Sequence, residues 1–189
     1  MVIVKIRERG KPAVHRYIGI DYSGAKTADS SLKGLRVYEA SHESLPVEVA
    51  PPPSPRKYWT RRGLAGWLAQ RLSEKVPTLV GIDHSFSFPL RYFEVHHLEP
   101  DWPTFLEDFQ KHWPTDSAHT YVDFIRDGLR GDGEARSGAT RWRRITEERA
   151  GAKSVFHFDV PGSVAKSTHA GLPWLRYLWS QLGERVHFW

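Results

Sequence analysis

Short apolar runs and one amphipathic segment alternate along the first half of the chain. The runs at 16–23, 33–40 and 46–50 are separated by turn-forming residues, which predicts three β-strands. After a proline-rich stretch that stops strand pairing, apolar residues recur at helical spacing through 61–75 and predict a helix. The nearly continuous apolar run at 78–85 predicts a strand buried on both faces. The predicted order is strand, strand, strand, helix, strand.

The second half of the chain is more helical and less regular. Proline in the first turn after Asp101 favours a helix there. Apolar periodicity predicts further helices at 117–129, 141–150 and 171–182. Alternating residues predict two more strands, at 153–160 and 185–189. We therefore expect an α/β protein that carries a helical insertion.

Composition narrows the class of protein. Of the 189 residues, 40% are hydrophobic and 26% are charged, which is typical of a globular chain and not of a disordered one. No run approaches the roughly 18 apolar residues of a membrane span, and the start lacks the pattern of a secretory signal. The absence of cysteine excludes disulfides and thiol chemistry. We expect a cytoplasmic protein with no membrane partner, with an N-terminal extension at 1–15 and one domain over 16–189.

The net charge of +5 is compatible with an anionic partner such as nucleic acid, and equally with simple solubility. A basic cluster in the second half is a candidate for phosphate contacts. Glu147 and Glu148 dilute this cluster, so a solvated helix face is the alternative interpretation. The cluster consists of Arg136, Arg141, Arg143, Arg144 and Arg149. The oligomeric state is not predicted.

Two segments share one pattern, IGIDYS at 18–23 and VGIDHS at 80–85. In each, Gly-Ile-Asp is followed by a ring and a serine, and the aspartate ends a predicted strand. Strand interiors disfavour aspartate, so its repetition at the same place calls for a reason. A ribonuclease H-like mixed sheet supplies one, with an antiparallel three-strand meander, a crossover helix and a fourth strand parallel to the first. Asp21 and Asp83 then end two neighbouring strands.

Carboxylates on neighbouring strands, about 4.8 Å apart, repel each other unless a cation neutralises them. Mg²⁺ or Mn²⁺ bound by carboxylate oxygens does so and supports phosphoryl transfer. Asp21 and Asp83 are therefore the predicted catalytic and metal-binding residues, and Gly19 and Gly81 allow backbone or substrate to approach closely. The alternative is that both aspartates cap the turns after their strands.

Three stretches carry a resemblance to a known family: YIGIDYSGA at 17–25, LVGIDHSFSFPL at 79–90 and SVFHFDVPGSVAKSTHAGLPWL at 154–175. They resemble the domain-of-unknown-function family 429, which is viewed as ribonuclease H-like and as predicted nucleases. The resemblance implies that Asp21 and Asp83 are the acids of the first and fourth strands. It also implies a later strand with glutamate before Tyr-Pro, which is missing here. We therefore expect a C-terminally incomplete domain.

Further site residues are predicted around the aspartate pair. A third metal-binding acid is expected from Asp159, with Glu147 or a missing C-terminus as alternatives. The run from Lys166 to His169 precedes a predicted helix and can offer backbone N–H groups to an anion, although it lacks the glycines of a phosphate loop; an ordinary helix cap is the other interpretation. The expected substrate-binding residues are Ser23, Gly24, His84, Ser85, Lys166, Ser167, Thr168 and His169.

Three functions compete on this basis. The leading hypothesis is a metal-dependent nuclease or phosphodiesterase. The second is an ATP-binding phosphotransferase, because the first hairpin of actin-like and sugar-kinase-like domains also begins with Gly-Ile-Asp, although such proteins usually need two such domains. The third is a non-catalytic nucleic-acid-binding module. Metal titration separates the first from the third, and nucleotide binding singles out the second.

Overall fold

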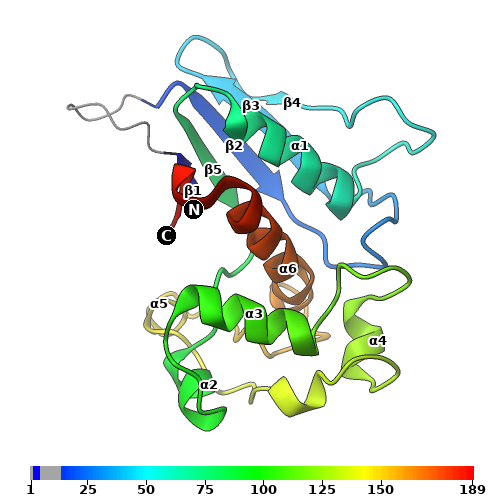
Figure 1. The fold of residues 1–189 in the computed structure, drawn as a ribbon, viewed down its shortest axis with the longest axis vertical. Helices are drawn as coiled ribbons and strands as arrows, with labels where there is room; N and C mark the ends of the chain where they lie inside the picture. The colour runs from blue at the N-terminus through cyan, green and yellow to red at the C-terminus, as the bar shows by residue number, and fades with distance from the viewer. Residues whose placement is uncertain (1, 5–13) are drawn as a thin grey trace. The chain divides into compact units, whose positions relative to one another are not determined.

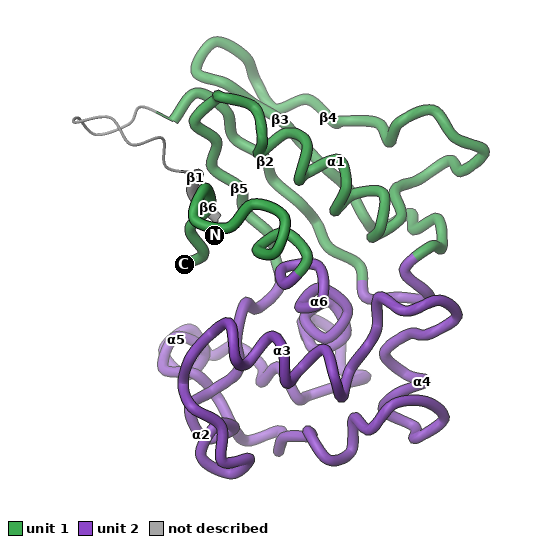
Figure 2. The backbone as a smooth tube through the Cα atoms, viewed as in Figure 1, with its two compact units in different colours: residues 1–23, 29–83, 177–189 green, residues 24–28, 84–176 purple. Residues whose placement is uncertain are grey.

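The computed structural model describes the backbone of residues 2–4 and the whole of residues 14–189. These residues form two compact units, which Figure 2 colours separately. Unit 1 comprises the described residues up to Ser23, together with Asp29–Asp83 and Tyr177–Trp189. Unit 2 comprises Gly24–Ala28 and His84–Arg176 and contains most of the helices expected as an insertion.

Unit 1 is built on a six-stranded mixed sheet with the order β4-β3-β2-β5-β1-β6 (Figure 1). The strands are β1 Val2–Val4, β2 Arg16–Asp21, β3 Arg36–Ser41, β4 Val47–Glu48, β5 Thr78–Ile82 and β6 Val186–Phe188. Strands β2, β3 and β4 are antiparallel neighbours, and β5 lies parallel to β2 on its other side. The predicted meander followed by a parallel fourth strand is therefore confirmed.

The edge of the sheet beyond β5 differs from the prediction. Strand β1 lies between β5 and β6 and is antiparallel to both. The sequence predicts an extension over residues 1–15, whereas Val2–Val4 form a strand of the sheet. The rest of that extension up to residue 13 lies outside the described residues. The strand predicted at 185–189 is confirmed as β6, and its partner is β1.

Helix α1, Arg61–Ser73, connects the meander to β5 and lies over one face of the sheet (Figure 1). It begins after Thr60, whose hydroxyl accepts a hydrogen bond from the backbone N–H of Gly63 and so satisfies a free donor of the first turn. Leu64, Leu68 and Leu72 recur every fourth residue and are buried. Their apolar stripe therefore packs onto the sheet and forms the core of unit 1.

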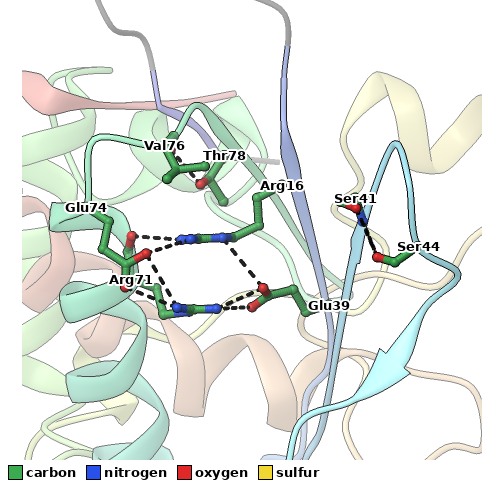
Figure 3. Close-up of polar contacts among 8 residues, drawn as sticks. All are labelled: Arg16, Glu39, Ser41, Ser44, Arg71, Glu74, Val76 and Thr78. Atoms are coloured by element: carbon green, nitrogen blue, oxygen red, sulfur yellow. Dashed lines mark hydrogen bonds and ion pairs between the residues drawn. The ribbon is translucent and has the colours of Figure 1, made fainter.

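An ion-pair network also ties α1 to the sheet (Figure 3). Arg16 on β2 contacts Glu74, just after α1, at 2.6 Å, and Arg71 on α1 contacts Glu39 on β3 at 2.8 Å. A 3.1 Å contact between Arg71 and Glu74 and a 3.6 Å contact between Arg16 and Glu39 close the network. Two cations thus share two carboxylates, so each charge has two partners of opposite sign.

Unit 2 is helical and aromatic. Its helices are α2 Leu90–Val95, α3 Trp102–His112, α4 Val122–Arg126, α5 Ile145–Arg149, the 3₁₀ helix η1 Glu134–Arg136 and the first part of α6 Ala165–Leu182. The predicted helix after Asp101 is confirmed as α3, and Asp101 caps it, since its carboxylate accepts from the Thr104 N–H at 2.9 Å. Phe88, Phe105 and Phe109 are buried in the core, and the Phe88 ring meets the other two in T-shaped contacts. None of the helices in the described part of the chain is long and apolar enough to cross a bilayer.

Two predictions in this half of the chain were wrong. The segment 153–160 forms turns instead of a strand. Val155 and Phe156 are both buried although they are adjacent, and a strand would send them to opposite faces. Helix α6 begins at Ala165 and not near 171, because the Ser163 hydroxyl accepts from the Ala165 N–H and starts the helix earlier. Helix α2 was not predicted.

The ion-pair network gives a pH-dependent prediction. Hydrogen bonding to Arg16, and secondarily to Arg71, lowers the pKa of Glu74 below 4.5. The stabilisation is therefore complete above that value and is lost as the pH falls through the lower pKa of the folded state. Replacing Glu74→Gln should decrease the free energy of unfolding by about 0.5–1 kcal/mol at pH 7, and the difference from wild type should vanish at acid pH. Urea unfolding over this pH range measures it.

The matched control is Glu43→Gln. Glu43 is exposed and forms no ion pair among the residues the structure describes. Its replacement should change stability little at any pH. A deficit in Glu74→Gln that stays constant from neutral to acid pH would contradict the network as its cause.

Candidate functional site

The pairing of β2 with β5 places the two aspartates side by side. Gly19 lies opposite Gly81 and Ile20 opposite Ile82 in the parallel ladder. The backbone N–H of Asp83 then donates to the Ile20 carbonyl at 3.3 Å, so the ladder continues to the aspartates. The predicted adjacency of Asp21 and Asp83 at the ends of neighbouring parallel strands is confirmed.

Both aspartates belong to the exposed face of their strands. In β2, Ile18 and Ile20 are only 2% and 4% exposed, whereas the alternate positions Gly19 and Asp21 are exposed. In β5 and just after it, Gly81 and Asp83 are exposed in the same way. Apart from each glycine and its two chain neighbours, no heavy atom of the described residues lies within 4 Å of the place where a Cβ would stand on Gly19 or Gly81. The glycine pair therefore leaves the backbone open on the face that carries the carboxylates.

The two carboxyls interact directly. Partial burial raises the pKa of Asp83, and the charge of Asp21 and a hydrogen bond between the two carboxyls raise it further. The backbone N–H of Tyr22 opposes this effect, since it donates to Asp83 Oδ1 at 2.7 Å and favours the ionised form. The backbone N–H of Tyr22, just after β2, therefore holds one oxygen of Asp83, while the neighbouring Asp21 raises the pKa of the same carboxyl.

Arg61 supports the segment that follows Asp21. Its side chain is fully buried, and its Nη1 donates to the Ser23 carbonyl at 3.0 Å. Burial lowers the pKa of Arg61, and the neighbouring Tyr22 and Asp29 oppose this shift. Sequence reasoning missed this residue. An arginine in the first turn of a helix lies at the positive end of the helix dipole, and that unfavourable placement was the available signal.

Gly24 and Lys166 come together within unit 2. A side chain on Gly24 would clash with the backbone of Lys166 at the start of α6. The Lys166 ammonium lies 2.8 Å from Asp123 and 2.9 Å from Asp159. Asp159 also pairs with Arg126. The hydrogen bond from Lys166 is the main reason why the pKa of Asp159 is low. The predicted third acid is therefore engaged with two cations in unit 2, and it lies on a turn and not on the predicted strand.

His84 and Ser85 are placed by contacts inside unit 2. The buried His84 ring bonds through Nδ1 to the Ser85 carbonyl at 2.9 Å, and burial lowers the pKa of His84 to about 4. The Ser85 N–H donates to Thr168 Oγ1 at 3.1 Å. The structure thus brings Ser85 and Thr168 together, as parts of a packed interior and not of an open anion cradle.

The remaining candidates also make internal contacts. The Ser167 hydroxyl donates to the Val164 carbonyl at 3.0 Å, and His169 Nδ1 donates to the Ala165 carbonyl at 2.9 Å. Glu147 is buried and accepts from the N–H of Arg144 at 2.7 Å, which caps α5. Glu147 therefore has a structural use that accounts for its burial.

No group of three or more His, Cys, Asp or Glu residues suited to hold a metal ion occurs within residues 2–4 and 14–189. Comparison with protein-family models, with curated proteins and with solved structures gives no match. The resemblance to family 429 therefore stays a prediction.

The carboxyl pair can be tested by titration. Replacing Asp21→Asn removes the charge that raises the pKa of Asp83, so the Asp83 pKa should fall toward 3.8. In the wild type, protonation of Asp83 favours the folded state, so stability should rise as the pH drops from the raised pKa toward 3.8. That rise should shrink in the variant. Carboxyl ¹³C resonances followed against pH measure the pKa directly.

Asp29→Asn is the matched control in the same unit. Asp29 pairs with Arg62 at 2.9 Å and is not among the groups that shift Asp83. The Asp29→Asn replacement should therefore leave the pKa of Asp83 unchanged. An Asp83 pKa that is the same in wild type and Asp21→Asn would show that the two carboxyls do not interact.

Proposed function

We propose that this chain is a divalent-metal-dependent phosphodiesterase of the ribonuclease H-like class that acts on nucleic acid. The observation that carries the proposal is the position of Asp21 and Asp83, side by side after adjacent parallel strands and on the exposed face. Two carboxyls in contact are unfavourable when both are charged, so the pair needs a reason beyond folding. A shared cation is the simplest reason.

The donor set suits Mg²⁺ or Mn²⁺. Both residues offer hard carboxylate oxygens, and both are exposed, so water and substrate oxygens can complete the coordination. Mg²⁺ is commonly held by one or two carboxylates together with substrate phosphates, so two acids are sufficient for such a site. When bound, the metal supplies neutralisation of phosphate charge and an activated water.

The residues around the two aspartates leave room for a phosphodiester and hold the carboxylates in position. The exposed backbone at Gly19 and Gly81 lets a bulky chain approach the carboxylates closely. The Tyr22 N–H orients the Asp83 carboxylate by donating to its Oδ1. The buried Arg61 holds the Ser23 carbonyl, so the loop after Asp21 keeps its position. Arg61 is therefore a positioning residue in this proposal.

The nucleic-acid substrate is supported by charge. The net charge is +5, and Arg141, Arg143 and Arg149 are exposed near α5. Their side chains have no hydrogen bond or ion pair with the residues that the structure describes, so they are suited to phosphate contacts. The topology of β2 to β5 and the resemblance to family 429 favour the same class of substrate. If the metal does not bind, the non-catalytic nucleic-acid-binding module becomes the better hypothesis.

Thermal melting in Mn²⁺ and in chelator tests the metal. Binding to the folded state alone should stabilise the wild type by about 1.4 kcal/mol at an ion concentration ten times the dissociation constant. Asp21→Asn and Asp83→Asn should lose most of this increase, whereas Asp29→Asn should keep it. A wild type that shows no shift at millimolar Mn²⁺ would refute the metal site.

Cleavage assays test the chemistry. Labelled single-stranded DNA, duplex DNA and RNA should be compared with Mn²⁺ and with chelator. We expect metal-dependent cleavage of at least one substrate, reduced at least about 100-fold in Asp21→Asn, because the pair acts as a unit. Metal binding without cleavage of any substrate would argue against the phosphodiesterase. If oligonucleotides still bind in that case, the chain is better explained as a non-catalytic nucleic-acid-binding module.

A further inference from the structure

The sheet of unit 1 has a second face, opposite to the one that α1 covers. Side chains alternate between the two faces of a strand, so this face is formed by the positions of β2 that alternate with Ile18 and Ile20, and by their partners in the paired strands. None of these positions is buried. We call this surface the open face, and it comprises Tyr17, Gly19, Asp21, Arg36, Tyr38, Ala40 and Gly81.

Tyr38 is the most exposed large side chain of the open face. It is 39% exposed, although it lies within a strand that has neighbours on both sides. The antiparallel register sets it opposite Gly19, and the parallel register sets Gly19 opposite Gly81. Because neither glycine carries a side chain, the Tyr38 ring can be reached from solvent across β2 and β5.

A second aromatic group lies on the same face, farther from the aspartates. The Tyr17 hydroxyl is 3.2 Å from His42 Nε2, and the two rings meet edge to face with their centres 5.5 Å apart. His42 is exposed and Tyr17 is half-buried. Tyr17 precedes Gly19 by two residues, so the order along β2 is ring, glycine and carboxylate. The open face therefore has aromatic side chains at one end and the carboxyl pair at the other.

The register also gives the separation between Tyr38 and the carboxyl pair. Asp21 lies opposite Arg36, which is two residues from Tyr38. One strand spacing of about 4.8 Å and two residues of about 3.3 Å each place the Tyr38 and Asp21 Cα atoms about 8 Å apart. This is about the length of one nucleotide in an extended strand. A base on Tyr38 would therefore belong to a nucleotide next to a phosphate at the aspartates.

The charges of the open face favour contacts to bases over contacts to phosphates. Arg36 is paired with Glu48 through both carboxylate oxygens, so its charge is balanced. Asp21 and Asp83 add negative charge until a cation binds. Attraction to a polynucleotide on this face must therefore come mainly from its rings. Stacking of bases on aromatic side chains supplies such attraction for single strands, whereas a duplex keeps its base faces inside the stack.

We propose that the open face binds a single-stranded segment of nucleic acid, with one base stacked on Tyr38 and the neighbouring phosphate at Asp21 and Asp83. Tyr17 and His42 extend the stacking surface to the next base along the strand. The choice of nucleic acid as the occupant rests on the proposed function, and the inference adds that the substrate has unpaired bases. Tyr38 belongs to the binding surface and takes no part in the chemistry.

The test compares two octamers that carry the same phosphate charge. One is octathymidylate, and the other has an abasic sugar at every position, so a difference in affinity reports contacts to the bases. Fluorescence anisotropy in chelator should show that the whole wild-type chain binds octathymidylate at least about tenfold more tightly than the abasic octamer. It should also bind octathymidylate more tightly than the corresponding duplex. Equal binding of both octamers, binding of neither, or tighter binding of the duplex would overturn the proposal.

Variants of one side chain separate stacking from other effects. Tyr38→Ala should lose most of the preference for octathymidylate, whereas Tyr38→Phe keeps the ring and should retain it. Tyr121→Ala is the matched control, because Tyr121 is a partly exposed tyrosine of unit 2. It should retain the preference as well. Full preference in Tyr38→Ala, or an equal loss in Tyr121→Ala, would contradict stacking on Tyr38.

Photocrosslinking of the wild type gives a result that does not depend on whether the variants fold. An octamer that carries 5-iodouracil should crosslink to Tyr38 or Tyr17, and the attachment point can be mapped by mass spectrometry. Crosslinks confined to other residues would overturn the proposal. Self-association that Tyr38→Ala abolishes, without any binding of octathymidylate, would also overturn it and would identify the open face as an interface between copies of the chain.

Failure of this inference can be distinguished from failure of the metal site. Asp21→Asn removes a negative charge from the open face, so in chelator it should bind octathymidylate as tightly as the wild type or more tightly. A base preference in a wild type that shows no Mn²⁺ shift would refute the phosphodiesterase and support the open face as a binding surface. A Mn²⁺ shift without any base preference would overturn the open-face proposal alone.

Discussion

The in-register parallel pairing of β2 with β5 is the contact on which the candidate site depends. It places glycine opposite glycine and brings Asp21 beside Asp83. Side chains alternate between the faces of a strand, so a slip by one residue would turn Asp21 inward and Ile20 outward. Burial of Ile18 and Ile20, at 2% and 4% exposure, therefore fixes the register as well as the core. Packing of the buried face of β2 therefore determines which side chains lie on its exposed face.

This arrangement keeps two unfavourable features that folding alone would avoid. Asp83 has a raised pKa beside Asp21, and Arg61 is buried at the positive end of a helix. Both are held by backbone groups just after β2, the Tyr22 N–H and the Ser23 carbonyl. The raised pKa of Asp83 and the burial of Arg61 both depart from the usual preferences of a folded chain, and both occur at the same end of the sheet. Natural proteins tend to have their functional sites where such departures occur together.

The sequence predicted the elements whose signals are local and periodic. The repeated Gly-Ile-Asp, separated by a helix long enough to cross over, was sufficient to predict two adjacent parallel strands. The proline just after Asp101 was sufficient to predict α3. The sequence misled at 153–160, where Val155 and Phe156 are both buried in turns. The sequence also could not show that His169 is buried and does not line an open anion site, because the rings that bury it come from distant segments such as Trp113. Burial of a polar residue is decided by tertiary contacts that have no local pattern.

The place of β1 has a consequence for the order in which the sheet assembles. Val2–Val4 pair with β5 on one side and with Val186–Phe188 on the other, so the first described strand of the sequence is completed by the last. Closing so long a loop carries an entropy penalty, and topologies rich in distant contacts fold slowly. During synthesis on the ribosome, β2, β3, β4 and β5 can pair early, whereas β1 keeps one edge open until β6 emerges. Until then, that edge is available to chaperones and to other strands.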